Sequence, residues 1–186
     1  HNNGIKWLLD RPLLSIPGEK FTYNDVIPQV VSSIIAYNTR RSLIEFSEKE
    51  LVKPLNLSTN LIASGQLTSR DMIKFGSLYL AGASSEYSGL LSKDWITSST
   101  NSHYLFKNSL TRQGYGYLWW TRNFTVNKQK YSSFYAAGNG GQYIVIVPKL
   151  ELVIALTGSN YNNVSQMSRS FDLIEKFILP SIKSHE

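Results

Sequence analysis

A glycine-rich turn between apolar, strand-like segments constrains the fold of this chain most strongly. Residues 136–141 (AAGNGG) place three glycines in four consecutive positions, immediately before the apolar run Gln142–Val147. Such a β-branched run is typical of a strand buried on both faces, and Pro148-Lys149 separates it from a third apolar run, Leu152–Leu156. Glycine at a strand end marks a tight turn or a place where a ligand or another backbone approaches closely. The sequence therefore predicts an antiparallel meander whose glycine turn is either an idle hairpin or a ligand-facing strand end.

Helical periodicity dominates the part of the chain before this meander. Apolar residues recur every three or four positions in residues 27–35, 42–52 and 72–79, which is typical of amphipathic helices. Asn24 or Asp25 is the expected cap of the first of these helices. The third begins at residues 68–71, which resemble a capping box.

The sequence pattern changes after residue 114, from the helical spacing of apolar residues to a strand-like, aromatic-rich run. The aromatic-rich residues 115–122 predict a strand, and apolar spacings of three and four predict a last helix over residues 164–178 that Pro180 closes. Helices come first, strands follow, and a helix ends the chain, an order that predicts an α+β fold. We expect a mainly helical portion over residues 1–110 and antiparallel strands plus a C-terminal helix over residues 111–186.

Composition excludes several kinds of chemistry. The 186 residues contain no cysteine, which rules out thiol nucleophiles and Cys-based metal sites and fits a periplasmic or secreted protein. His103 is the one histidine away from the ends, so a Ser-His-Asp triad would depend on it, and a zinc site with several histidines is excluded. We expect no cofactor and no metal. The surviving hydrolytic options use lysine, tyrosine or carboxylates.

Charge and hydropathy limit the kinds of partner that this chain is expected to bind. The net charge of +6 is spread along the chain, and its densest basic cluster, Arg40-Arg41, is too small to indicate nucleic-acid binding. No apolar run approaches the ~20 residues that a membrane-spanning helix needs. The expected partner is therefore a small-molecule or peptide substrate.

Four short segments occur in an order that is more informative than any one of them. They are PGEKFTY at residues 17–23, EF and KPLNL within residues 45–57, LTSRDMIKFG at residues 67–76, and GYGYLWW at residues 114–120 followed by GNGGQ at residues 138–142. In this order they resemble the C-terminal part of the serine β-lactamase-related hydrolases, the family of class C β-lactamases, DD-peptidases and related esterases. The resemblance covers nearly the whole chain and implies one incomplete domain of the β-lactamase/transpeptidase-like fold.

That family's chemistry implies roles for two groups of residues here. Its tyrosine, which moves a proton to the leaving group, corresponds to Tyr23, and Asp25 stands where the motif has Asn or Ser. Asp25 cannot donate the amide hydrogen bond expected there. The alternative is structural, with Tyr23 a half-buried aromatic residue and Asp25 a helix cap.

The second group is the substrate-lining strand. The family's Lys/His-x-Gly motif corresponds to Ala136, Ala137 and Gly138, so Ala136 replaces a cation or imidazole. Recognition of a penicillin-like carboxylate should suffer, which favours an esterase or peptidase over a β-lactamase. The backbone N–H of Asn139 corresponds to a donor of the oxyanion hole, and a backbone donor survives side-chain change.

The family's nucleophile motif, Ser-x-x-Lys, is missing, because no serine in the sequence has a lysine three residues later. The nearest pattern, residues 125–128, is interpreted as a hairpin loop. The resemblance therefore implies that this chain is part of a longer serine hydrolase, and that the segment alone has no acyl-transfer activity. The alternative is a non-catalytic binding or scaffolding domain. Without the remaining segment an edge and an apolar face would be exposed, so we also expect pairing with that segment or with another copy.

Overall fold

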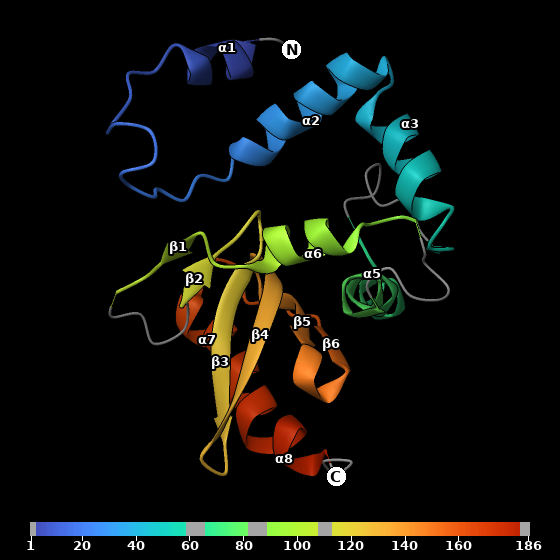
Figure 1. The fold of residues 1–186 in the computed structure, drawn as a ribbon, viewed down its shortest axis with the longest axis vertical. Helices are drawn as coiled ribbons and strands as arrows, with labels where there is room; N and C mark the ends of the chain where they lie inside the picture. Colours follow the sequence, from blue (N-terminus) through green and yellow to red (C-terminus); the bar gives the residue numbers. More distant parts are fainter. Residues whose placement is uncertain (1–2, 59–65, 82–88, 108–112, 183–186) are drawn as a thin grey trace.

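A computed structural model describes residues 3–58, 66–81, 89–107 and 113–182 of the chain. Its centre is an antiparallel sheet in which each strand pairs with the next strand in the sequence, in the order β1-β2-β3-β4-β5-β6 (Figure 1). The strands are β1 (Tyr104–Leu105), β2 (Gly114–Tyr115), β3 (Trp120–Val126), β4 (Gln129–Gly138), β5 (Gln142–Val147) and β6 (Leu152–Leu156). The predicted meander is confirmed, and β5 and β6 have the predicted bounds.

The helices precede and follow this antiparallel sheet instead of alternating with its strands, which is the segregation typical of an α+β fold. Those before it are α1 (Asn3–Leu9), α2 (Ile27–Thr39), α3 (Leu43–Ser47) with its π-helical extension η1 (Glu48–Val52), α5 (Ser69–Ala81) and α6 (Lys93–Thr100). A short 3-10 turn, η3 (Pro148–Leu150), joins β5 to β6. The chain closes with α7 (Val164–Leu173), the π-helical turn η4 (Ile174–Ile178) and α8 (Leu179–Ser181).

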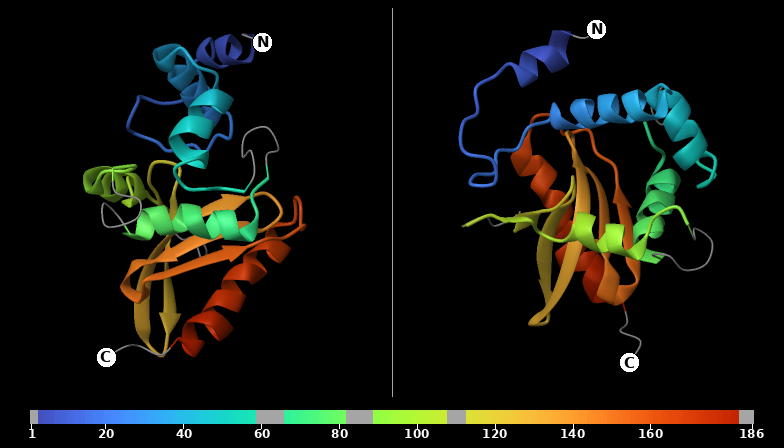
Figure 2. Two further views of the ribbon diagram at one scale, coloured as in Figure 1. Left: turned by 90° about the vertical axis from the view of Figure 1, so that its right-hand side faces the viewer. Right: turned by 45° about the horizontal axis from the view of Figure 1, so that its top comes forward.

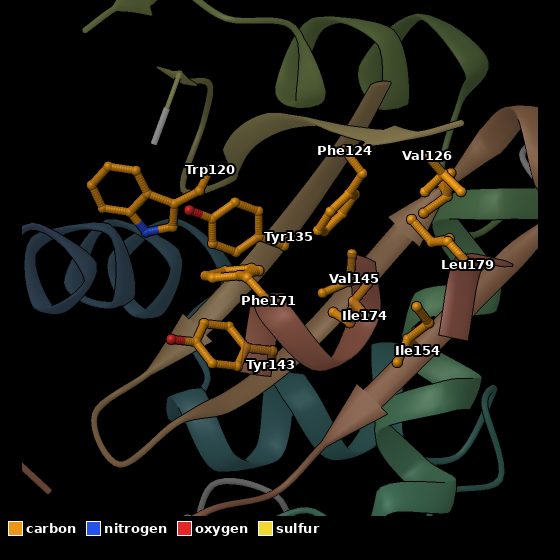
Figure 3. Packing of buried hydrophobic residues seen from close by; sticks show 11 residues of the cluster. Trp120, Phe124, Val126, Tyr135, Tyr143, Val145, Ile154, Phe171, Ile174 and Leu179 are labelled. Carbon is orange, nitrogen blue, oxygen red and sulfur yellow. The ribbon is translucent and has the colours of Figure 1, made fainter. Parts of the chain in front are cut away.

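Helices cover both faces of the sheet (Figure 2). On one face, Phe171 and Ile174 from the C-terminal helices pack against Phe124, Tyr135 and other buried side chains of the strands (Figure 3). On the other face, α5 packs against β5 and β6. Side chains of β5 alternate between the two clusters and are buried in both, which confirms the prediction of a strand without a solvent face.

Side-chain caps fix the starts of four of the described helices, α3, α5, α6 and α7. Ser42 and Glu45 form a complete capping box at the start of α3. At the start of α5 the Thr68 hydroxyl accepts a hydrogen bond from the Asp71 N–H (3.1 Å) and donates one to the Asp71 carboxylate (2.7 Å). The predicted cap of α2 is wrong in position, because the N-cap is Val26. The Asn24 Oδ1 instead accepts a hydrogen bond from the Val26 N–H, in the turn that precedes the helix.

The strand predicted over residues 115–122 is also wrong. A tight turn divides it into β2 and β3, closed by a 2.8 Å hydrogen bond from the Gly116 N–H to the Trp119 carbonyl. Leu118 has a φ of 66° in this turn, which is incompatible with an extended strand. Trp119 and Trp120 nevertheless pack into opposite faces of the sheet, as expected for adjacent residues at a strand start.

Helix α2 is poorly covered by the rest of the chain. None of its residues is fully buried, and Ile34 and Tyr37 are 56% and 70% exposed. In Figures 1 and 2, α1, α2 and α3 gather at one end of the molecule, beyond the sheet. An apolar helix face of this kind is unusual on a self-contained domain.

Candidate active site

The end of β4 lines a cleft of about 630 Å³. All four strand-end residues predicted from the sequence, from Ala136 to Asn139, contribute to this one cleft. Its other walls come from α5 and the segment before it, from β5 and from the segment after β6: Gln66, Leu67, Met72, Gln142, Tyr143, Ile144, Thr157 and Tyr161. The volume is in the range of small-ligand sites.

One edge of this strand end has no neighbouring strand in the described part of the chain. Strand β3 begins at Trp120, which pairs with Tyr135, so residues 136–138 of β4 lie beyond the start of β3. On their other side the same residues pair with β5, from Ala136 opposite Ile144 to Gly138 opposite Gln142. A strand edge left open in this way presents backbone donors and acceptors to a ligand.

The turn after β4 requires its glycines. Gly140 and Gly141 have φ values of 110° and 93°, which L-residues with a side chain rarely adopt. The Gly141 N–H donates to the Gly138 carbonyl across the turn (3.3 Å). The glycines therefore serve the hairpin whether or not a ligand binds.

Asparagine side chains fix this turn to the segment that follows β6. The amide group of Asn139 donates to Oδ1 of Asn162, and its own Oδ1 accepts the Asn162 N–H, each at 2.9 Å. A second link joins the Asn160 N–H to the Gly140 carbonyl (2.9 Å). The Asn139 backbone N–H has no acceptor among the described residues. Sequence reasoning missed Asn160 and Asn162, and the asparagine-rich run 160–163 was the one available signal.

Tyr23 lies beside the start of β3 rather than on the wall of the cleft. Its ring is 53% exposed and packs 5.3 Å from the ring of Trp120 and 6.0 Å from that of Tyr115. Burial, with a smaller contribution from Tyr23, raises the pKa of Tyr115. Trp120 pairs with Tyr135, the residue before Ala136, and so links Tyr23 to β4 one residue before the open strand end.

Asp25 is exposed and does not line the cleft in the part of the chain that the structure describes. His103 is held by a 2.7 Å contact between Nε2 and the Ser98 carbonyl, and its ring stacks on Tyr117 at 4.3 Å. It is thus engaged in local structure. Within the described ranges, no three His, Asp or Glu side chains gather as a metal site would need.

Comparison with known proteins identifies the fold. A β-lactamase of Mycobacterium bovis superposes with a TM-score of 0.65 at 15% identity, over 88% of this chain and 66% of that structure. A protein assigned as a 6-aminohexanoate-dimer hydrolase from Bacillus anthracis gives 0.65 at 20% identity, over 91% and 47%. An octameric penicillin-binding protein homologue from Pyrococcus abyssi gives 0.65 at 17% identity, over 87% and 44%.

These similarities show that the chain has the β-lactamase/transpeptidase-like fold, as the sequence motifs implied. No protein-family model and no curated protein matches the sequence. The chain spans between 44% and 66% of the length of these three structures, so it corresponds to part of the fold. None of the helices described here is both long and apolar enough to cross a membrane.

Proposed function

We propose that this chain is part of a serine hydrolase that cleaves an amide or an ester through an acyl-enzyme. The observation that carries the proposal is the open end of β4, where residues 136–139 line one cleft. The nucleophilic serine and its lysine would come from a segment outside the 186 residues, since the sequence contains no Ser-x-x-Lys. The named activities of the three similar structures, all hydrolytic or penicillin-binding, support this class of reaction.

In the proposed reaction the serine oxygen forms a bond to the acyl carbon while the bond to the leaving group breaks. Tyr23 accepts the serine proton and returns it to the leaving amine or alcohol. The backbone N–H of Asn139 stabilises the negative charge on the acyl oxygen. The hydrogen bonds between Asn139 and Asn162 would keep that donor in place. Water then releases the acyl group from the serine.

The side chains at the open strand end favour a neutral substrate. Ala136, where the family's motif has a cation or an imidazole, offers no positive charge to a substrate carboxylate. Small esters and uncharged amides or peptides are therefore preferred to β-lactams, which carry a carboxylate beside the reactive ring.

The test uses the 186-residue chain and a longer protein that joins it to the upstream part of its own reading frame. We expect a fluorophosphonate probe to leave the 186-residue chain unlabelled and to label the longer protein on a Ser-x-x-Lys serine. In the longer protein, Tyr23→Phe should lower ester hydrolysis by about 10²–10⁴-fold. The matched variant Tyr37→Phe, in exposed α2, should leave it unchanged.

Two outcomes would reject this function. Labelling of the 186-residue chain itself would place a nucleophile within it. An upstream region without Ser-x-x-Lys, together with no labelling, would favour the alternative of a non-catalytic binding domain.

A further inference from the structure

A second cavity, separate from the cleft at the end of β4, lies between the segment after α1 and the sheet edge formed by β1 and β2. Its volume is about 580 Å³, within the range of small-ligand sites. Apolar and aromatic side chains dominate its walls: Phe21, Ile27, Val31, Trp95, Tyr104, Tyr115, Tyr117 and Leu118. Lys20 and His103 also contribute. We call this cavity the aromatic pocket.

The aromatic side chains of this pocket are unusually exposed for their size. Trp95 and Tyr117 are 47% and 50% exposed, with ring centroids 5.9 Å apart. Phe21 stacks on Tyr104 at 5.0 Å and so joins the N-terminal part of the chain to the sheet edge. Half-exposed aromatic rings gathered in one hollow mark a binding site for an apolar group.

Backbone contacts hold the pocket wall in a fixed shape. The Tyr117 N–H donates to the Ser99 carbonyl of α6 at 2.8 Å, and a Cβ on Gly116 would lie 2.3 Å from that same carbonyl oxygen. Leu118, half-exposed on the wall, has the left-handed φ of 66°. This conformation belongs to the tight turn between β2 and β3, which holds the Leu118 backbone at the pocket wall.

Tyr23 does not line the pocket but packs against one residue of its wall. Tyr115 lines the pocket, and the ring of Tyr23 meets it edge-on at 6.0 Å. On its other side Tyr23 packs against Trp120, which pairs with the residue before Ala136. Tyr23 thus contacts both the wall of the aromatic pocket and the β3 residue that pairs next to the open strand end.

We propose that the aromatic pocket binds the leaving group of the substrate, an alcohol or amine that carries an uncharged phenyl-sized ring. This assignment rests on the proposed function, because Tyr23 is there the residue that returns the proton to the leaving group. A group protonated by Tyr23 must lie beside it, and the hollow beside Tyr23 is lined by aromatic rings.

The first experiment measures binding without catalysis, in the 186-residue chain. Benzyl alcohol serves as the leaving-group probe and ethanol as its control, followed through the indole N–H signals of the tryptophans by NMR. Benzyl alcohol should shift the Trp95 signal and leave that of Trp7, 57% exposed on α1, in place, and ethanol should shift neither. Trp95→Ala should weaken binding by about 3- to 10-fold, and the matched Trp7→Ala should not change it.

A second variant keeps the test independent of folding defects. Leu118→Gly relieves the left-handed backbone conformation and removes one wall of the pocket. It should weaken benzyl alcohol binding without lowering the thermal midpoint of the chain. An unshifted Trp95 signal, equal shifts at Trp7 and Trp95, or unchanged binding in both pocket variants would each overturn the pocket assignment.

The second experiment compares benzyl acetate with ethyl acetate in the longer protein. The benzyl ester should have the higher kcat/KM, and Trp95→Ala should remove that preference, whereas Trp7→Ala should leave both the preference and ethyl acetate hydrolysis unchanged. Hydrolysis with no benzyl preference overturns the pocket and keeps the hydrolase. Benzyl alcohol binding at Trp95 with no hydrolysis of any ester overturns the hydrolase, and with it the leaving-group role of the pocket.

Discussion

Asn139 and Asn162, in turns on either side of strands β5 and β6, exchange two hydrogen bonds of 2.9 Å each. One uses both side chains, and the other joins the Asn139 side chain to the Asn162 backbone N–H. The pair ties the glycine turn to the segment after β6, so it fixes the geometry of the proposed oxyanion donor. Asn162 itself has a φ of 58°, which asparagine tolerates better than most residues.

Two variants separate these hydrogen bonds. Asn139→Ala removes both and should lower the free energy of unfolding by about 2 kcal/mol, whereas Asn162→Gly removes one without backbone strain and should cost about 1 kcal/mol. Urea denaturation checks both values. Hydrogen exchange gives a sharper contrast, because the Asn162 amide should exchange faster in Asn139→Ala and remain protected in Asn162→Gly. Equal protection in the two variants would contradict the assigned bonds.

The stability of the chain should fall at acid pH through Asp71. This side chain is 1% exposed, and its carboxylate accepts hydrogen bonds from the Ser58 N–H (2.9 Å) and hydroxyl (2.5 Å) and from the Thr68 hydroxyl (2.7 Å). Burial alone would raise the pKa of Asp71, but these bonds outweigh it and lower the pKa from 3.8 to about 2. The stabilisation is therefore complete above about pH 3.8 and is lost as the pH falls towards 2.

Substitution of Asp71 isolates this contribution. Asp71→Asn should cost about 2 kcal/mol at pH 7, because the amide cannot accept all three bonds, and the difference from the unmodified chain should shrink below pH 4. Asp172→Asn, at an exposed carboxylate paired with Lys176, is the matched control and should change stability by less than about 0.5 kcal/mol. Denaturation midpoints measured from pH 2.5 to 7 would show a constant difference for Asp71→Asn if the carboxylate were not ionised over this range.

Two glycines should respond differently to an added methyl group. A Cβ on Gly158 would lie 2.6 Å from the Gly140 carbonyl oxygen, so Gly158→Ala should push the cleft turn away at a cost of about 2–3 kcal/mol. Gly18→Ala meets no atom within 4 Å and suffers only from its φ of 91°, which costs about 1 kcal/mol. Thermal unfolding of the two variants checks the order, and a larger loss in Gly18→Ala would contradict the close approach at Gly158.

The exposed apolar face of α2 should make the 186-residue chain associate with itself. Ile34 and Tyr37 are the most exposed apolar residues of this helix, and sequestering them from water is favourable. Light scattering should show a mass that rises with concentration, and Ile34→Glu with Tyr37→Glu should lower it. Gln29→Glu, an equal charge change per site at an exposed polar position of α2, is the control. A concentration-independent monomer would reject this prediction.

The sequence predicted those parts of the fold that depend on local chemistry. The β-branched runs of β5 and β6 and the capping interaction between Thr68 and Asp71 follow from short-range rules. The break at residues 116–119 was missed because it depends on a left-handed Leu118, a residue that gives no turn signal. The Asn139–Asn162 pair was missed because it joins residues that only the completed β5–β6 hairpin brings together.

The candidate site was predictable only in part, because some of its residues are neighbours in the sequence and others are brought together only by the completed fold. Residues 136–139 are consecutive, so their sharing of one cleft follows from the turn. The position of Tyr23 against Trp120 depends on how residues 10–26 cross the sheet edge, and no local pattern specifies that path. The catalytic assignment of Tyr23 is a prediction that Tyr23→Phe tests, and the assignments of Asp25 to substrate binding and of the Asn139 N–H to the oxyanion hole are predictions as well.

The sequential order of the six strands has a consequence for how this chain reaches its structure. Every strand pair joins segments that are neighbours in the sequence, so each pairing closes only a short loop and loses little chain entropy. Sheets of such local pairings form faster than those that must bring distant segments together. The hairpin of β4 and β5, with its glycine turn, can therefore form before α2 finds any partner. One wall of the cleft would then be in place early and could serve as the surface on which the rest of the site assembles.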